Sequence, residues 1–294
     1  MSDDEKTRHQ QEYEKLLALF ISFLKNIDSN SRNDIVYALM ELRADIAIQY
    51  GCDGFGMDEE EALQLLRNVD ENTLSPEQNE KRKRIIAMVE NLIAFAVCEE
   101  YHVVKDTDKV YKKHKKNNPD YEIDYNDPDD IDEYTDINEQ YNDQYAAVEN
   151  ADIMYAMGIA AWWLGMNQYD LITYWTMNDA KVRPWHMALQ GYTAPRDEFP
   201  AWMIPPIEWN CRCFLLPAEK VDPSQVWDKV DFKRVVGKVP TKPKQIDDTF
   251  SESVAKCGRI FGKSHNYFKV DKADKDFLDD CVKRIKDKYY AKEH

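Results

Sequence analysis

The sequence predicts a predominantly helical α+β protein, in which a helical amino-terminal region is joined to a compact α+β module. Apolar residues recur at spacings of three and four through the first hundred residues, the period of a helix with one buried face. Only nine of the 294 residues are glycine, and 43% hydrophobic with 32% charged residues is typical of a globular chain. Near residue 210 the pattern changes to the alternation of a short strand.

The first helix is expected from the apolar stripe between residues 13 and 27, whose members are Tyr13, Leu16, Leu17, Phe20, Leu24 and Ile27. A second helix is expected to start after Ser31, a residue type that caps helix amino termini, and to stop before Gly51. Its apolar face consists of Ile35, Leu39, Leu42 and Ile46. These stripes favour a buried core rather than a membrane or partner surface.

The tetrapeptide "SPEQ", residues 75–78, predicts the start of the third helix. Ser75 stands at the N-cap, Pro76 in the first turn and Gln78 where a capping box has its return partner. Its core face is expected to contain Ile85, Val89, Leu92 and Ala96.

Charge reverses sharply after this helix. The stretch "KVYKKHKK" at 109–116 is basic, and no Lys or Arg then occurs from Asn117 through Ala180. The acidic, tyrosine-dotted part predicts a solvated, partly disordered linker over residues 117–144. The alternative is an acidic strap that docks on a basic partner in competition with nucleic acid. A calcium site is disfavoured because the Gly and terminal Glu of an EF-hand loop are missing.

A strongly apolar helix is expected from about residue 146 to Gly165, with Met154, Met157, Ala161 and Trp162 facing inward. Pro184 should lie in the first turn of a short segment that Gly191 ends. The stretch "PPIEWNCRCFLLP", residues 205–217, predicts a strand with Cys211 and Cys213 on one face and Arg212 on the other. Residues 218–294 have mixed charge, with "VPTKPK" at 239–244 as a loop and a final helix over about 274–290.

Composition and charge exclude several classes of protein. The formal net charge of −16 argues against a surface that binds nucleic acid as a whole, so DNA contact would have to be local, with the mildly basic tail as the best candidate. No run of about 18 apolar residues and no signal-peptide core occur, which predicts neither a membrane span nor export. Four separated cysteines, Cys52, Cys98, Cys257 and Cys281, favour small buried residues in a reducing cytoplasm.

The residues around 175–213 allow three kinds of chemistry. His186, Cys211 and Cys213, with Asp179 as a fourth ligand, could hold a structural zinc ion. Arg183 could instead hold a phosphate while His186 moves a proton, as in an enzyme that acts on nucleic acid or a nucleotide. In the third interpretation Asp179 pairs with Arg183 while Trp175 and the remaining side chains pack a small domain.

The ordered pattern of these residues resembles the phage Mu F-like minor head protein family, also called phage head morphogenesis proteins. The motif consists of Trp175, Thr176, Asp179, Val182, Arg183, His186, Leu189, Gly191, Pro206, Asn210, Cys211, Arg212 and Cys213. The resemblance covers residues 145–217, and divides the chain into a helical region at 1–116, a linker at 117–144, this module, and a carboxyl-terminal region at 218–294.

The resemblance implies a non-enzymatic, low-copy component of a tailed-phage head that acts in head assembly and in DNA packaging or delivery near the portal. Portal and capsid proteins are the implied partners, with packaged DNA contacted through local basic patches and no membrane. The implied location is the capsid interior or portal vertex of the virion, after synthesis in the bacterial cytoplasm. No cofactor other than a structural zinc ion is expected.

The sequence departs from the resemblance at two places. Many similar proteins have a Cys pair where this chain has Arg183 and His186, and a His-Pro where it has Glu208 and Trp209. The departure removes at least one ligand from the zinc interpretation. Two alternatives to the head protein remain. One is an enzyme that acts on nucleic acid or a nucleotide, and the other is a zinc-stabilised interaction module.

Overall fold

The computed structural model describes residues 3–67, 73–222, 224, 227–228, 248–250 and 252–291. The chain forms two compact units, each built from several segments of the sequence. The first comprises Met1–Gln49, Leu92–Ala151 and Asn266–His294, and the second comprises Tyr50–Asn91 and Asp152–His265. The predominantly helical α+β class is confirmed, whereas these discontinuous units differ from the four consecutive regions that we expected.

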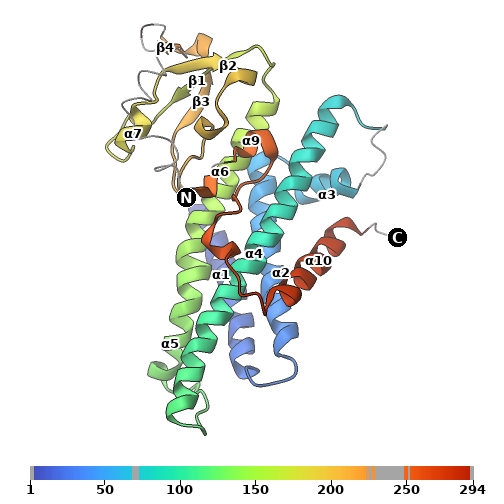
Figure 1. Cartoon of the computed structure of the whole chain (residues 1–294), viewed down its shortest axis with the longest axis vertical. Helices are drawn as coiled ribbons and strands as arrows, with labels where there is room; N and C mark the ends of the chain where they lie inside the picture. Colours follow the sequence, from blue (N-terminus) through green and yellow to red (C-terminus); the bar gives the residue numbers. More distant parts are fainter. Residues whose placement is uncertain are drawn as a thin grey trace. The chain divides into compact units, whose positions relative to one another are not determined.

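Helices dominate the described part of the first unit (Figure 1). They are α1 (Asp3–Lys25), most of α2 (Arg32–Phe55), most of α4 (Pro76–Asn117), α5 (Pro128–Glu139) and α10 (Lys275–Tyr290), with a 3-10 turn at Asn266–Phe268. The apolar stripe predicted for α1 is core, because Leu16, Phe20, Leu24 and Ile27 are at most 9% exposed. The final helix was likewise predicted correctly. The loop predicted at 239–244 lies outside the described residues.

The predicted end of α2 at Gly51 is wrong, because the helix continues to Phe55. Tyr50, Cys52 and Phe55 are buried and carry the apolar face beyond the glycine. The helix stops before Gly56, whose φ of 75° lies in the left-handed region that ends helices. Burial of the side chains around Gly51 thus outweighs its low helix propensity.

The start of α4 follows the predicted capping box. The Ser75 backbone amide donates to Gln78 Oε1 at 2.9 Å, and the Gln78 amide donates to Ser75 Oγ at 3.1 Å. The four predicted core residues Ile85, Val89, Leu92 and Ala96 are at most 2% exposed. Two reciprocal hydrogen bonds therefore satisfy two of the otherwise unpaired amides at this terminus.

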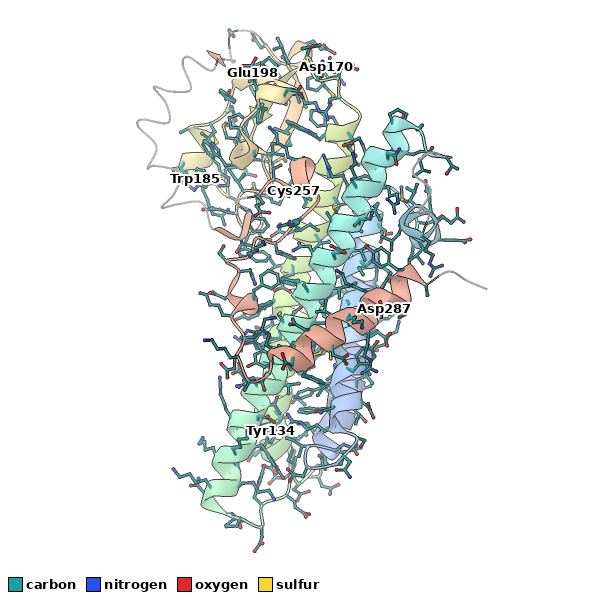
Figure 2. All side chains as sticks on the ribbon, turned by 45° about the vertical axis from the view of Figure 1, so that its right-hand side comes forward. Tyr134, Asp170, Trp185, Glu198, Cys257 and Asp287 are labelled. Carbon is teal, nitrogen blue, oxygen red and sulfur yellow. The ribbon has the colours of Figure 1, made fainter. Side chains whose placement is uncertain are left out.

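The linker prediction for residues 117–144 is wrong, because this segment contains α5 and a π-helical turn, η2 (Gln140–Tyr145), that leads into α6 (Ala146–Leu164). Asp127 caps α5 by accepting from the Asp129 amide at 3.1 Å, and Pro128 occupies the first turn. Tyr134, labelled in Figure 2, is fully buried, and its hydroxyl lies 3.1 Å from that of Tyr121. The charge of this segment alone suggested disorder. The buried tyrosine and the helix cap instead hold it in an ordered conformation.

Helices α4 and α5 run antiparallel in the first unit, since His114 near the end of α4 pairs with Glu133 at 2.6 Å and Asp106 accepts from the Tyr141 hydroxyl at 3.0 Å. Helix α1 packs against α5 and η2. His9 of α1 contributes a 2.8 Å contact from Nε2 to Asp143 Oδ1.

A buried ionic network lies in the core of the first unit. Arg43 is fully buried, and its Nε lies 2.7 Å from a carboxylate oxygen of Glu99. One terminal nitrogen lies 2.9 Å from a carboxylate oxygen of Glu149, and the other donates to the Asn150 side chain at 3.0 Å. A third carboxylate, Glu100, is fully buried as well. One guanidinium thus faces three acids, and the excess of carboxylates favours their protonated forms.

The excess of buried acid predicts a stability that falls with rising pH. Burial raises the pKa of Glu100 from 4.5 to about 7, against lowering contributions from Asn142 and Arg43. Between these values the folded chain holds a proton that the unfolded chain has released. The free energy of unfolding should therefore decrease as the pH increases, by at most ~1.4 kcal/mol per pH unit for this group.

The substitution Glu100→Gln should raise the free energy of unfolding at pH 8 and flatten its slope between pH 5 and pH 8, because glutamine keeps the shape but cannot ionise. Urea titrations at several pH values measure this. Glu77→Gln is the matched control, since Glu77 is on the same helix with a side chain 75% exposed. An unchanged slope in Glu100→Gln would contradict the assignment.

The second unit combines a small sheet with helical segments. Helix α3 (Glu59–Arg67), the carboxyl-terminal end of α2, the start of α4 and most of α6 belong to it, together with the short helices α7 (Pro184–Met187) and α9 (Val254–Cys257). Its strands are β1 (Leu171–Trp175), β2 (Tyr192–Pro195), β3 (Phe214–Pro217) and β4 (Trp227–Asp228). Short 3-10 turns lie at Arg196–Glu198, Ala201–Met203, Ala218–Lys220 and Asp248–Phe250.

The strand order is β3-β1-β2-β4 (Figure 1). Strand β1 is antiparallel to both neighbours, with Ile172 opposite Ala194 of β2 and Thr173 opposite Leu216 of β3, and β4 pairs in parallel with β2. The buried side of the sheet packs with Ile159 and Trp163 of α6. Helix α6 ends at Leu164, as predicted. Its buried apolar residues include Ile153, Ala156, Met157, Ala160 and Trp163, so only Met157 of the four expected is fully buried.

Helices α2 and α6 approach closely in the second unit because two glycines face each other. A Cβ placed on Gly54 would lie 2.1 Å from the Met154 carbonyl oxygen, whereas a Cβ on Gly158 would lie 3.3 Å from the Gly54 carbonyl oxygen. The first contact involves backbone, which cannot rotate away. The crossing therefore requires glycine at position 54.

Gly54→Ala should destabilise the protein by about 1–2 kcal/mol, because the overpacking penalty of about 2–3 kcal/mol exceeds the gain of about 1 kcal/mol in helix propensity. Gly158→Ala is the matched control and should be close to neutral. Thermal or urea unfolding of both variants tests this. Equal effects at the two positions would show that the close approach does not constrain the chain.

Among the described residues, no helix is both long and apolar enough to cross a membrane. All six cysteines are free, and the isolated Cys52 and Cys281 are buried as expected.

Candidate functional site

The site lies where the loop after β1, the short helix α7 and the segment before β3 meet in the second unit. Arg183 is the N-cap of α7 and Pro184 its first residue, as predicted. Gly191 adopts a φ of 87°, and its amide donates to the Tyr174 carbonyl at 2.9 Å, which returns the chain to the sheet. A side chain at this left-handed position would be strained.

Thr176 fixes the loop after β1. The Asn178 amide donates to its hydroxyl at 3.2 Å, and the hydroxyl donates to Gln190 Oε1 at 2.5 Å. Asn178 itself has a φ of 52°, a conformation that asparagine tolerates better than most residues. The threonine thus ties the loop to the end of the segment after α7.

The predicted ion pair between Asp179 and Arg183 is wrong. Asp179 Oδ1 instead lies 2.5 Å from a terminal nitrogen of Arg212, and it also accepts from the Lys181 amide at 2.9 Å. The Arg212 hydrogen bond lowers the pKa of Asp179. Arg183 points to another carboxylate, so the two expected partners belong to separate pairs.

Arg183 binds the segment before β3 at two points. Its Nε lies 2.6 Å from Glu208 Oε2, and a terminal nitrogen donates to the Trp209 carbonyl at 2.9 Å. Glu208 was not among the predicted site residues. Its partner Arg183 lies 25 positions away in the sequence, and no helix or strand periodicity relates residues at that distance.

His186, Cys211 and Cys213 come together as predicted. The three side chains are at most 4% exposed, and His186 Nδ1, Cys211 Sγ and Cys213 Sγ all lie within 4.8 Å of one another. His186 Nδ1 is 3.2 Å from Cys213 Sγ and 3.9 Å from Cys211 Sγ. The fourth ligand that we expected, Asp179, is bonded to Arg212 and is not part of this cluster.

A hydrogen bond between the two thiols shifts their pKa values in opposite directions. The Cys213 thiol donates to Cys211, and this bond lowers the pKa of Cys211 well below its ordinary value, with His186 adding to the shift. The same bond and burial raise the pKa of Cys213. Trp185, labelled in Figure 2, lies edge-on against the His186 ring, with the ring centroids 4.1 Å apart. The indole therefore packs against the imidazole of the cluster.

Residues 211–213 lie outside any strand, because β3 begins at Phe214. The predicted alternation nevertheless holds, since both cysteines are buried and Arg212 is exposed. Trp175, expected to be the packing anchor, is only half-buried, and its neighbour Tyr174 is the fully buried aromatic residue of β1. The Pro205-Pro206 peptide bond is cis.

Asp152 on α6 is a site residue that the sequence interpretation did not include. Its Oδ2 accepts from the backbone amide of Asn210 at 2.8 Å, and Asp152 is 4% exposed. Asn210 has a φ of 55°, which turns the chain just before the cysteines. The signal in the sequence was a lone charged residue between Asn150 and Tyr169, in an otherwise apolar helix.

Residues 131–216 match the family model described as Phage Mu protein F like protein. This segment is Mu F-like. It begins earlier than the boundary of residue 145 that we expected, within α5, and it covers less than a third of the 294 residues. No curated protein and no solved structure shows a significant match.

The Mu F-like motif is used largely for internal contacts. Asp179, Arg183 and the His186 cluster each contact residues 208–213 of the same segment. An enzyme that used Arg183 and His186 would have to expose both side chains to its substrate. His186 is 2% exposed, which disfavours that alternative because a substrate could not reach the imidazole.

Asp152→Ala should lower the free energy of unfolding by about 1 kcal/mol, because it removes the hydrogen bond that the Asn210 amide donates to a buried side chain. Asp179→Ala, which removes a carboxylate whose side chain is 41% exposed, is the matched control from the same motif region. Its loss should be smaller than that of Asp152→Ala, as for an exposed ion pair. Urea unfolding monitored by tryptophan fluorescence measures both, and a larger loss for Asp179→Ala would reverse the ranking.

Proposed function

We propose that this protein is a minor capsid, or head morphogenesis, protein of a bacteriophage, which acts in head assembly and in DNA packaging or delivery near the portal. The observation that carries the proposal is the Mu F-like match over residues 131–216. The protein would be made in the bacterial cytoplasm and incorporated into the virion, at the capsid interior or portal vertex.

The arrangement of the motif supports a structural rather than a catalytic role. Asp179 with Arg212 and Arg183 with Glu208 join the loop before α7 to the segment before β3. Pairs of this kind stabilise one arrangement of two irregular segments instead of presenting groups to a substrate. The surfaces outside these pairs are then available to portal and capsid proteins, the partners that we propose.

The charge distribution supports protein partners more than DNA. The basic run at 109–116 forms the end of α4, where Lys109 pairs with Asp106 at 2.7 Å, Lys112 with Asp108 at 3.7 Å and Lys115 with Asp28 at 3.9 Å. These carboxylates weaken the local positive potential that phosphate binding requires. With a net charge of −16, contact with packaged DNA would be restricted to small patches.

Deletion of the gene from the phage that encodes this chain tests the proposal. We expect infectious titre to fall by orders of magnitude, with heads that are absent, misshapen or empty of DNA in electron micrographs. Quantitative mass spectrometry of purified wild-type virions should detect the chain at low copy number relative to the major capsid protein.

Complementation with the wild-type chain, or with the exposed-residue variant Glu77→Gln, should restore normal heads. Normal titre and filled heads after deletion, together with absence of the chain from purified virions, would refute a role in the head.

A further inference from the structure

The three ligand atoms of the His186 cluster already have the spacing of a tetrahedral metal site. Zn–S bonds of about 2.3 Å and Zn–N bonds of about 2.0 Å put nitrogen and sulfur about 3.5 Å apart around one tetrahedral ion. The distances from His186 Nδ1, 3.2 Å to Cys213 Sγ and 3.9 Å to Cys211 Sγ, lie on either side of this value. Shifts of a few tenths of an ångström would therefore accommodate an ion.

The donor set selects the kind of ion. Two thiolates and an imidazole are soft or borderline ligands, which zinc prefers and which magnesium and calcium avoid. Cys211 and Cys213 are separated by one residue, a spacing that disfavours a disulfide between them. Both are free and buried.

Each ligand side chain also has an outer partner. Glu208 Oε2 lies 3.3 Å from His186 Nε2, the ring nitrogen opposite the sulfurs. The Ile207 backbone forms a hydrogen bond to Cys211, and the Tyr174 hydroxyl lies beside Cys213. A carboxylate on the far nitrogen of a histidine fixes the tautomer that binds metal. His186 Nε2 is buried with Glu208 Oε2 as its neighbouring acceptor, and Arg183 Nε holds the same oxygen at 2.6 Å.

We propose that His186 through Nδ1, Cys211 and Cys213 bind one zinc ion, and that Glu208 is a positioning residue that holds the imidazole in the metal-binding tautomer. Asp179 is not a ligand, and water occupies the fourth position. The ion would join α7 to the segment before β3, as the Arg183–Glu208 pair does. This inference is independent of the proposed function, because it rests on the geometry of the cluster alone.

Metal analysis of the full chain, purified from cells grown with added zinc, tests the proposal. We expect about one zinc per chain by mass spectrometry of the metal, and a lower melting temperature after treatment with a zinc-selective chelator. Replacement of zinc by Co²⁺ should give the intense visible bands of a tetrahedral site and a near-ultraviolet thiolate band, a readout that needs no variant.

Variants then assign the ligands. Cys211→Ser and Cys213→Ser should each lose the metal, whereas Cys257→Ser, at a half-buried cysteine elsewhere in the same unit, should keep one zinc per chain. Glu208→Gln should keep the cobalt spectrum but bind zinc about 10–100-fold more weakly in competition with a chromophoric chelator.

Less than a tenth of an equivalent of zinc after reconstitution, with a melting temperature that the chelator does not change, would overturn the proposal. An unchanged zinc affinity in Glu208→Gln would overturn the positioning role of Glu208. If Cys211→Ser or Cys213→Ser fails to fold, the Co²⁺ thiolate band of the wild-type chain still decides whether the cysteines bind metal.

Discussion

The hydrogen bond between the Asp152 carboxylate and the Asn210 amide positions much of the candidate site. It connects α6 to the turn that precedes both cysteines, and Asn210 adopts a left-handed φ of 55° at that turn. Residues 211–213 form no strand pairing with the sheet, so little other backbone bonding holds them in place. Because the Asp152 side chain is buried, this hydrogen bond should contribute more to stability than an exposed ion pair does.

From this turn the remaining contacts follow in order. Once residues 208–213 lie against α7, Glu208 reaches Arg183, Arg212 reaches Asp179, and the two sulfurs approach His186. The motif is therefore a set of links between two segments that have almost no regular structure of their own. The paired motif residues lie 25–33 positions apart in the sequence, and each pair has one member before β2 and one after it.

The first unit depends on a different kind of constraint. Arg43 is fully buried with Glu99 and Glu149, while Glu100 is buried close by. Such a network contributes less to stability than an apolar core of the same volume, but removal of the arginine alone would leave uncompensated charge. The network joins α2, α4 and α6, and it makes the stability of the protein sensitive to pH.

The local elements could be predicted from the sequence, since their signals lie within a few residues of one another. The capping box of Ser75 and Gln78, the apolar stripe of α1, and the turn at Pro184 and Gly191 were all found this way. The metal-ligand interpretation of residues 175–213 likewise grouped His186, Cys211 and Cys213. Tertiary structure alone decided that α2 passes through Gly51, that the acidic segment folds into α5, and that Asp179 pairs with Arg212 instead of Arg183. Helix ends, the order of charged segments and the choice of ionic partners depend on burial and on contacts between distant residues, which local sequence does not contain.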